Sequence, residues 1–117
     1  MPLPWVRLDT AMPDHPKILD LIEHRDGRAA AFVWVCSLAY AGKHGTDGFI
    51  PKGALARCNG QSKHALLLVA AGLWKDEGVG WTIPGWEEYQ ESNAETQARS
   101  DKARRAAFAR WGKEAEF

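Results

Sequence analysis

One stretch of this chain has hardly any polar side chains. Residues 28–41 read RAAAFVWVCSLAYA, and apolar residues cover nearly every face of the helix that they predict. A surface helix keeps one polar face, whereas a helix that is apolar all round must be covered by other elements. We therefore expect residues 28–41 to form a helix in the middle of the core, ended by Gly42.

Length and charge restrict the class of protein. The chain has 117 residues, enough for one domain with a sizeable core, and 15 basic residues balance 15 acidic ones. No apolar run approaches the roughly 20 residues that a membrane span needs, and the start, MPLPWVRLD, lacks the features of a signal peptide. Cys36 and Cys58 fall in apolar helical patterns, which favours packing roles in a reducing compartment. We expect a protein of the cytoplasm.

Shorter elements are predicted around the central helix. Before it comes a helix at about residues 15–24, capped by Asp14 and apolar on one face. After it the pattern predicts, in order, a small strand at Phe49-Ile50, a helix at 51–58, an Asn59-Gly60 turn, a helix at 62–71 capped by Ser62 and ended by Gly72, and a β-hairpin whose arms are residues 73–75 and 81–83.

The helix after the Asn-Gly turn has its polar residues gathered at one end. Gln61, Ser62, Lys63 and His64 open it, and an apolar body that we expect to be buried follows. In helix-turn-helix proteins the second helix of the pair meets the DNA major groove through its N-terminal residues. The sequence thus predicts a mostly α fold with a small β-hairpin, a winged helix-turn-helix with an extra N-terminal helix and a long C-terminal helix. The alternative is that the four residues only cap and solvate an ordinary helix.

Basic residues outside this helix extend the predicted DNA surface. The hairpin tip is acidic, because Asp76 and Glu77 outnumber its one cation, Lys75. This counts against a wing that binds phosphates strongly. The candidate DNA-contacting residues are Lys52, Arg57, Gln61, Ser62, Lys63, His64, Lys75, Lys102, Arg104, Arg105 and Arg110.

The C-terminal part has a different composition. We assign residues 1–86 to the winged helix-turn-helix domain and residues 87–117 to a basic helical tail, with one long helix from Glu87 to about Trp111. Phe108 and Trp111 are three residues apart, so they share one helical face and are candidate partner-binding residues. We expect the tail to pair with a second copy of the chain, as a homodimer. The alternative is a solvated helical face.

Catalytic patterns are weak. The four histidines fall in separate elements, neither HxxxH nor CxxC spacing occurs, and no serine or cysteine has a recognisable base partner. We expect no enzyme, no metal and no cofactor. The tryptophans at 34, 74, 81 and 86 are expected to build the core, with Trp74 and Trp81 facing each other across the hairpin.

Several stretches resemble a known family. The segments that carry the resemblance are PWVRLD, MPDHPKI, TDGFIPKGAL, LVAAGLW and W.I.GWEEYQES, within residues 3–93. They are similar to small replication proteins of actinobacterial phages and prophages, and to the N-terminal winged helix domain of phage replisome organisers, which are related to DnaD-type primosome proteins. The resemblance implies binding of double-stranded origin DNA and recruitment of a replication helicase or its loader. Two rivals stay open: a protein-interaction module of a replication complex, and a small transcriptional regulator or excision factor.

Overall fold

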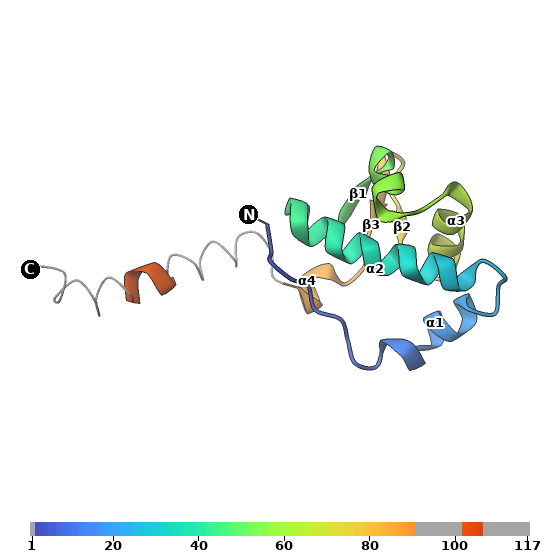
Figure 1. The fold of residues 1–117 in the computed structure, drawn as a ribbon, viewed down its shortest axis with the longest axis horizontal. Helices are drawn as coiled ribbons and strands as arrows, with labels where there is room; N and C mark the ends of the chain where they lie inside the picture. Colours follow the sequence, from blue (N-terminus) through green and yellow to red (C-terminus); the bar gives the residue numbers. More distant parts are fainter. Residues whose placement is uncertain (1, 91–101, 107–117) are drawn as a thin grey trace, which may run out of the picture.

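The computed structural model describes residues 2–90 and 102–106, and the chain forms a small α+β domain (Figure 1). The elements in chain order are η1 (Met12–Asp14), α1 (Pro16–Leu21), α2 (Gly27–His44), β1 (Phe49–Pro51), η2 (Lys52–Cys58), α3 (Ser62–Ala70), β2 (Lys75–Asp76), β3 (Gly80–Thr82) and α4 (Trp86–Tyr89), where η marks a 3-10 helix. Residues 102–106 are also helical. From α2 to β3 this is the order of elements that the sequence predicts.

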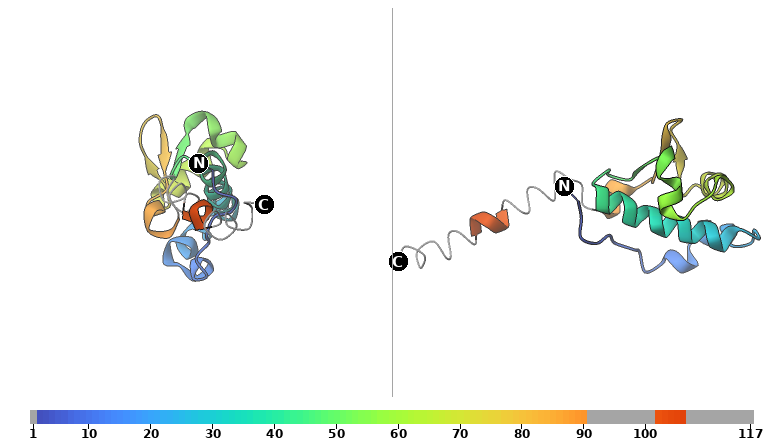
Figure 2. Two further views of the ribbon diagram at one scale, coloured as in Figure 1. Left: turned by 90° about the vertical axis from the view of Figure 1, so that its left-hand side faces the viewer. Right: turned by 45° about the horizontal axis from the view of Figure 1, so that its top comes forward.

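Helix α2 runs along the middle of the domain (Figures 1 and 2). The N-terminal segment and α1 lie on one side of it, and η2, α3 and the strands lie on the other. Ala30, Val33, Leu38 and Ala41 are buried, which confirms its central place. The expectation of cover on every side is wrong at Phe32, which is 58% exposed.

The end of α2 differs from the prediction. The helix continues through Gly42 to His44, and Gly45 ends it in the left-handed conformation, with φ of 64°. Gly42 is needed for a different reason, because a Cβ there would lie 2.4 Å from Cγ1 of Val6. The N-terminal segment crosses α2 at this point, where the Leu3 N–H donates to the Gly42 carbonyl at 2.7 Å.

Helix α1 is shorter than predicted. It spans Pro16–Leu21, and its cap is His15, whose Nδ1 accepts a hydrogen bond from the Lys17 N–H at 3.1 Å. Asp14, the expected cap, belongs to η1. Ile18 and Leu21 are buried, so the predicted apolar face is correct.

The sheet has three short antiparallel strands in the order β1-β3-β2. Trp81 in the central strand lies opposite Ile50 on one side and Asp76 on the other. Strands β2 and β3 form the predicted hairpin, but its arms are Lys75–Asp76 and Gly80–Thr82 rather than residues 73–75 and 81–83, and β1 completes the sheet. Gly80 lets β1 approach, since a Cβ there would lie 2.3 Å from the Ile50 carbonyl oxygen.

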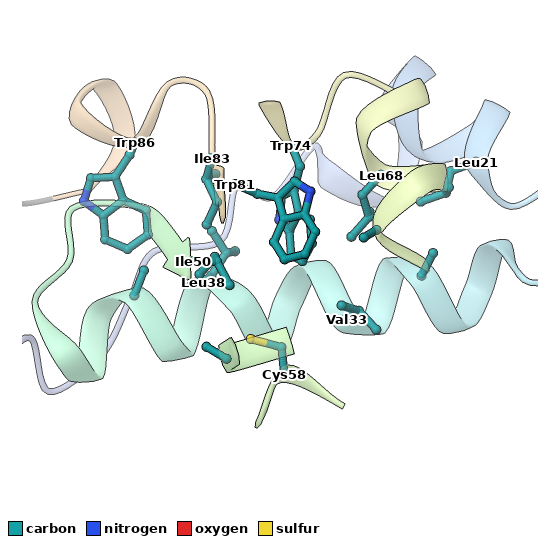
Figure 3. Packing of buried hydrophobic residues seen from close by; sticks show 14 residues of the cluster. Leu21, Val33, Leu38, Ile50, Cys58, Leu68, Trp74, Trp81, Ile83 and Trp86 are labelled. Carbon is teal, nitrogen blue, oxygen red and sulfur yellow. The ribbon is translucent and has the colours of Figure 1, made fainter. Parts of the chain in front are cut away.

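Tryptophans dominate the core between α2 and the strands (Figure 3). Trp74 and Trp81 are 1% and 9% exposed and stack on each other, as predicted. Nε1 of Trp74 donates to Ser37 Oγ at 3.1 Å. Trp86 is also buried, and Trp34 packs half-buried against the same cluster.

Both ends of α3 are set by backbone that turns left-handed nearby. Asn59 has a φ of 62°, and its N–H donates to the Ala56 carbonyl, which separates η2 from α3. The N-terminal cap is Gln61, in extended conformation, rather than the expected Ser62. At the other end Gly72 has a φ of 78°, as the sequence predicts.

The prediction of one continuous helix from Glu87 onward is wrong at Gln90. Helix α4 covers only Trp86–Tyr89, and Gln90 is extended. Its amide holds the N-terminal segment: Oε1 accepts from the Arg7 N–H at 2.7 Å and Nε2 donates to the Arg7 carbonyl at 2.6 Å. The packed body therefore continues to Gln90. The predicted helix at residues 91–101 and 107–111 lies outside the described residues, and the domain boundary after residue 86 stays a prediction.

Candidate nucleic-acid interface

The first turn of α3 presents three of its four polar residues to solvent. Gln61, Ser62 and Lys63 are exposed, whereas Ala65 and Leu68 are buried and hold the helix on the core. The packing of α3 on α2 therefore leaves the N-terminal turn of α3 accessible. Amide, hydroxyl and ammonium groups at this turn are suited to hydrogen bonds with base edges or phosphates.

His64 does not belong to this surface, which corrects its predicted role. Its side chain is 7% exposed, and Nδ1 accepts a hydrogen bond from the Gln61 N–H at 3.0 Å. A side chain three residues after the cap can reach back to the cap N–H and satisfy a donor that the helix leaves unpaired. The spacing from Gln61 to His64 was the available signal, with histidine in the place that glutamate usually takes.

Lys63 is paired with an acidic residue. Its Nζ lies 3.3 Å from Oδ1 of Asp26, at the start of α2, and its side chain is 55% exposed. Exposed ion pairs of this kind contribute about 1 kcal/mol or less. The pair is weak enough for a phosphate to compete with the carboxylate for the ammonium group.

Lys52 and Arg57 are exposed on η2. The Lys52 N–H donates to the Val79 carbonyl at 3.2 Å, which fastens the start of η2 to the tip of the hairpin. Two of the elements that carry predicted DNA-contacting cations thus touch directly.

The hairpin uses its own acidic side chains. Asp76 Oδ1 accepts from the Gly78 N–H at 2.8 Å, and Glu77 Oε1 accepts from Thr82 Oγ1 at 3.0 Å. Lys75 Nζ lies 3.7 Å from the same Glu77 oxygen. These contacts stabilise the turn, and they leave Lys75 beside a carboxylate that partly neutralises it.

Sequence reasoning missed an exposed apolar strip on α3. Leu66 is 72% exposed, so the expectation that the apolar body of α3 is buried is wrong there. Ala70, one turn further on, is also exposed. At the hairpin tip Val79 is 73% exposed. The residue types gave no signal, because leucine and valine fit a buried face equally well.

The candidate residues of the tail are described only in part. Lys102, Arg104 and Arg105 are exposed on a helical segment. Arg110 and the candidate partner-binding residues Phe108 and Trp111 lie outside the described residues, so their roles stay predictions.

A cavity of about 190 Å³ lies beneath the N-terminal segment. Its walls are mostly apolar and include Ile18, Trp34, Leu38, Ile83 and Trp86. The Nε1 atoms of Trp34 and Trp86 are buried without a hydrogen-bond partner. At its edge Lys17 Nζ donates to the Gly72 carbonyl at 3.3 Å, tying α1 to the end of α3. The lining residues carry no arrangement that indicates a reaction.

The described residues were compared with what a metal site and a membrane-spanning helix require. Within residues 2–90 and 102–106, no three His, Cys, Asp or Glu side chains are grouped to hold a metal ion. Over the same residues, every helix is too short or too polar to cross a membrane.

The chain was compared with protein families, curated proteins and solved structures. No family model, no curated protein and no solved structure matches this chain.

Proposed function

We propose that this chain is a winged helix module that binds double-stranded DNA, with α3 in the major groove. The carrying observation is the order α2, β1, η2, α3, β2, β3 together with the sheet order β1-β3-β2. In this arrangement η2 and α3 are the helix-turn-helix pair, and the β2–β3 hairpin is the wing. The exposed first turn of α3 is then the part that contacts base edges.

Each polar residue of that turn has a chemical role in the proposal. The Gln61 amide is able to donate and accept at once, which suits the paired donor and acceptor of adenine. The Lys63 ammonium binds either guanine acceptors or a phosphate. Ser62 adds one hydroxyl at the helix start, where unpaired backbone N–H groups favour an anion.

The charge of the surface sets the expected strength of binding. Four exposed cations of the body belong to the proposed DNA surface, namely Lys52, Arg57, Lys63 and Lys75. If each neutralises one phosphate, log K falls with log salt at a slope of about 3.6. Affinity would then drop roughly 150-fold between about 50 mM and about 200 mM salt. The tail cations would steepen this slope.

The biological setting of the proposal comes from the sequence resemblance. The resemblance to phage replisome organisers supports a role for this DNA binding in phage or prophage replication initiation, and we propose a replication helicase or loader as the protein partner. The surface has less positive charge than strong DNA binding by a winged helix requires, because the wing carries Asp76 and Glu77 and the first turn of α3 exposes one lysine. We therefore expect modest affinity for DNA outside a specific site.

A gel-shift series over increasing salt, on DNA from the neighbourhood of the gene, tests this function. The parent should show the steep salt dependence given above. A Gln61→Ala/Lys63→Ala variant should bind more weakly while staying folded, with a loss of stability of about 1 kcal/mol from the altered helix cap. Lys43→Ala is the matched control, because Lys43 is equally a surface lysine but lies in the last turn of α2. Equal binding by the double variant and the parent would remove α3 from the interface.

Deletion of residues 99–117 tests the tail. If the tail pairs two copies and its arginines contact phosphate, the truncated protein should have a lower mass in solution and a flatter salt slope. An unchanged mass and slope would make the tail a solvated extension and leave DNA binding to α3 and the cations beside it on the body.

A second candidate is a protein-interaction module with the same fold. The exposed side chains of Leu66 and Val79 favour it, because an apolar partner would bury them. Salt separates the two functions: an apolar protein contact keeps its strength as salt rises, whereas DNA binding does not. A transcriptional regulator or excision factor would bind DNA in the same way and differ in the site that it recognises.

A further inference from the structure

We propose that Leu66 contacts the C5 methyl group of thymine in the major groove, an inference that rests on the proposed binding of DNA through α3. Leu66 lies in the middle of the outward side of α3, one turn after Lys63 and one turn before Ala70. Its side chain is 72% exposed, so no other described part of the protein covers it.

Beyond its first turn, the outward side of α3 has no side chain that forms hydrogen bonds. Leu66 and Ala70 are exposed there, and Val69 is half-buried. In the major groove the base edges present donors, acceptors and a single apolar group, the thymine methyl. A leucine gains contact only at that methyl group. Against any other base it displaces water from polar atoms and offers no hydrogen bond in return.

The spacing along α3 places this contact beside the polar ones. Leu66 follows the exposed first turn by one helical turn, about 5.4 Å, while successive bases of one strand are about 3.4 Å apart. Polar contacts from Gln61 and Lys63 and an apolar contact from Leu66 therefore fall one or two base steps apart. Lys63 lies three residues before Leu66 and is exposed on the same face of α3, so a cation beside Leu66 favours a polyanion over an apolar protein there.

Removing and adding methyl groups in the DNA tests the inference directly. The probes are a short A·T-rich duplex with thymine, the same duplex with deoxyuridine in place of thymine, and a G·C duplex with cytosine or 5-methylcytosine. For the parent, deoxyuridine should weaken binding about fourfold for each methyl group contacted, and 5-methylcytosine should strengthen it by a similar factor.

Variants assign the effect to one side chain. Leu66→Ala should bind the thymine and deoxyuridine duplexes equally, and alanine keeps the helix intact because of its high helix propensity. Leu19→Ala is the matched control, since Leu19 is 46% exposed on α1, and it should keep the parent's preference.

The outcomes separate this inference from the function on which it rests. Equal affinity of the parent for thymine and deoxyuridine duplexes, with DNA binding retained, overturns the role of Leu66 and leaves the proposed function standing. A methyl preference that survives Leu66→Ala also overturns it, because another residue then contacts the methyl. Absence of binding to every duplex overturns the proposed function itself.

Discussion

The indole rings of Trp74 and Trp81 are stacked, with their centroids 5.1 Å apart and an angle of 28° between their planes. Trp74 follows the C-terminal turn of α3, and Trp81 lies in the central strand. The indole N–H of Trp74 donates a hydrogen bond to Oγ of Ser37 in α2. This pair fixes α3, the sheet and α2 relative to one another, which a surface built from α3 and the hairpin requires.

Replacing Trp81 by alanine should destabilise the fold strongly. The change removes a buried ring and one half of the stack, and such truncations cost about 3 to 5 kcal/mol. Urea denaturation measures the loss. Trp5→Ala is the control, because Trp5 is 77% exposed and should change the free energy of unfolding little. Equal stability of Trp81→Ala and the parent would contradict the role of the stack.

Ser37 is predicted to matter through its hydroxyl. Ser37 Oγ accepts from Trp74 Nε1 and donates to the Trp34 carbonyl at 2.6 Å, and its side chain is fully buried. Ser37→Ala leaves the indole N–H without an acceptor, at a cost of about 1 to 3 kcal/mol. Thermal unfolding of this variant should begin at a lower temperature than that of the exposed control Ser62→Ala. Matching transitions would show that the indole finds another acceptor.

Two glycines give a matched test of the sheet. A Cβ at Gly80 would lie 2.3 Å from the Ile50 carbonyl oxygen, whereas a Cβ at Gly53 would meet nothing within 4 Å. Gly80→Ala should therefore separate β1 from β3 and lower the free energy of unfolding by more than 1 kcal/mol, about the scale of a backbone clash. Gly53→Ala should be neutral or stabilising by up to about 1 kcal/mol. The reverse order of stability would refute the close approach of the strands.

The core was predictable where the residue type and its position in the sequence both indicate the same structure. Trp74 and Trp81 flank a run of turn residues, so both the hairpin and their contact across it follow from the sequence. Gly72 is likewise a strong signal, because a helix end in the left-handed conformation favours glycine. These features depend on local chemistry, and local chemistry is visible in the sequence.

The surface was less predictable, since it depends on which face of an element meets the body. Leu66 and Leu68 are the same residue type, yet one is exposed and the other buried. His64 resembles its polar neighbours in sequence but turns back to cap the helix. Gln90 ends α4 through bonds to Arg7, 83 residues earlier in the chain, and no local pattern reports such a contact.

Stability should also depend on alkaline pH through Cys58. Burial, with a smaller contribution from Cys36, raises the pKa of the Cys58 thiol from its ordinary 9.0 to about 11. The unfolded chain loses this proton near pH 9 and the folded chain does not, so the contribution of the thiol is complete below pH 9 and is lost between pH 9 and pH 11. Urea midpoints measured across this window should fall, and Cys58→Ala should flatten the fall. Cys36→Ala should keep most of it, because burial is the larger cause.

The ion pair between Lys63 and Asp26 leads to two opposite predictions for DNA binding. Lys63→Ala should weaken binding and lower the salt slope by about 1, the effect of one lost phosphate contact. Asp26→Asn should strengthen binding, because the Lys63 ammonium then has no carboxylate 3.3 Å away to compete with phosphate. Both variants should unfold within about 1 kcal/mol of the parent, since the pair is exposed.

Combining the two changes decides whether the pair itself controls the lysine. Removing any acidic residue from a DNA-facing surface reduces general repulsion, so Asp26→Asn will strengthen binding somewhat even without Lys63. If the ion pair restrains the lysine, the gain measured by fluorescence anisotropy will be larger in the parent than in the Lys63→Ala background. Equal gains in the two backgrounds would mean that Asp26 acts only through repulsion. Lys63 would then be as available to DNA in the parent as in the Asp26→Asn variant, and the pair would hold α2 and α3 together without tuning the interface.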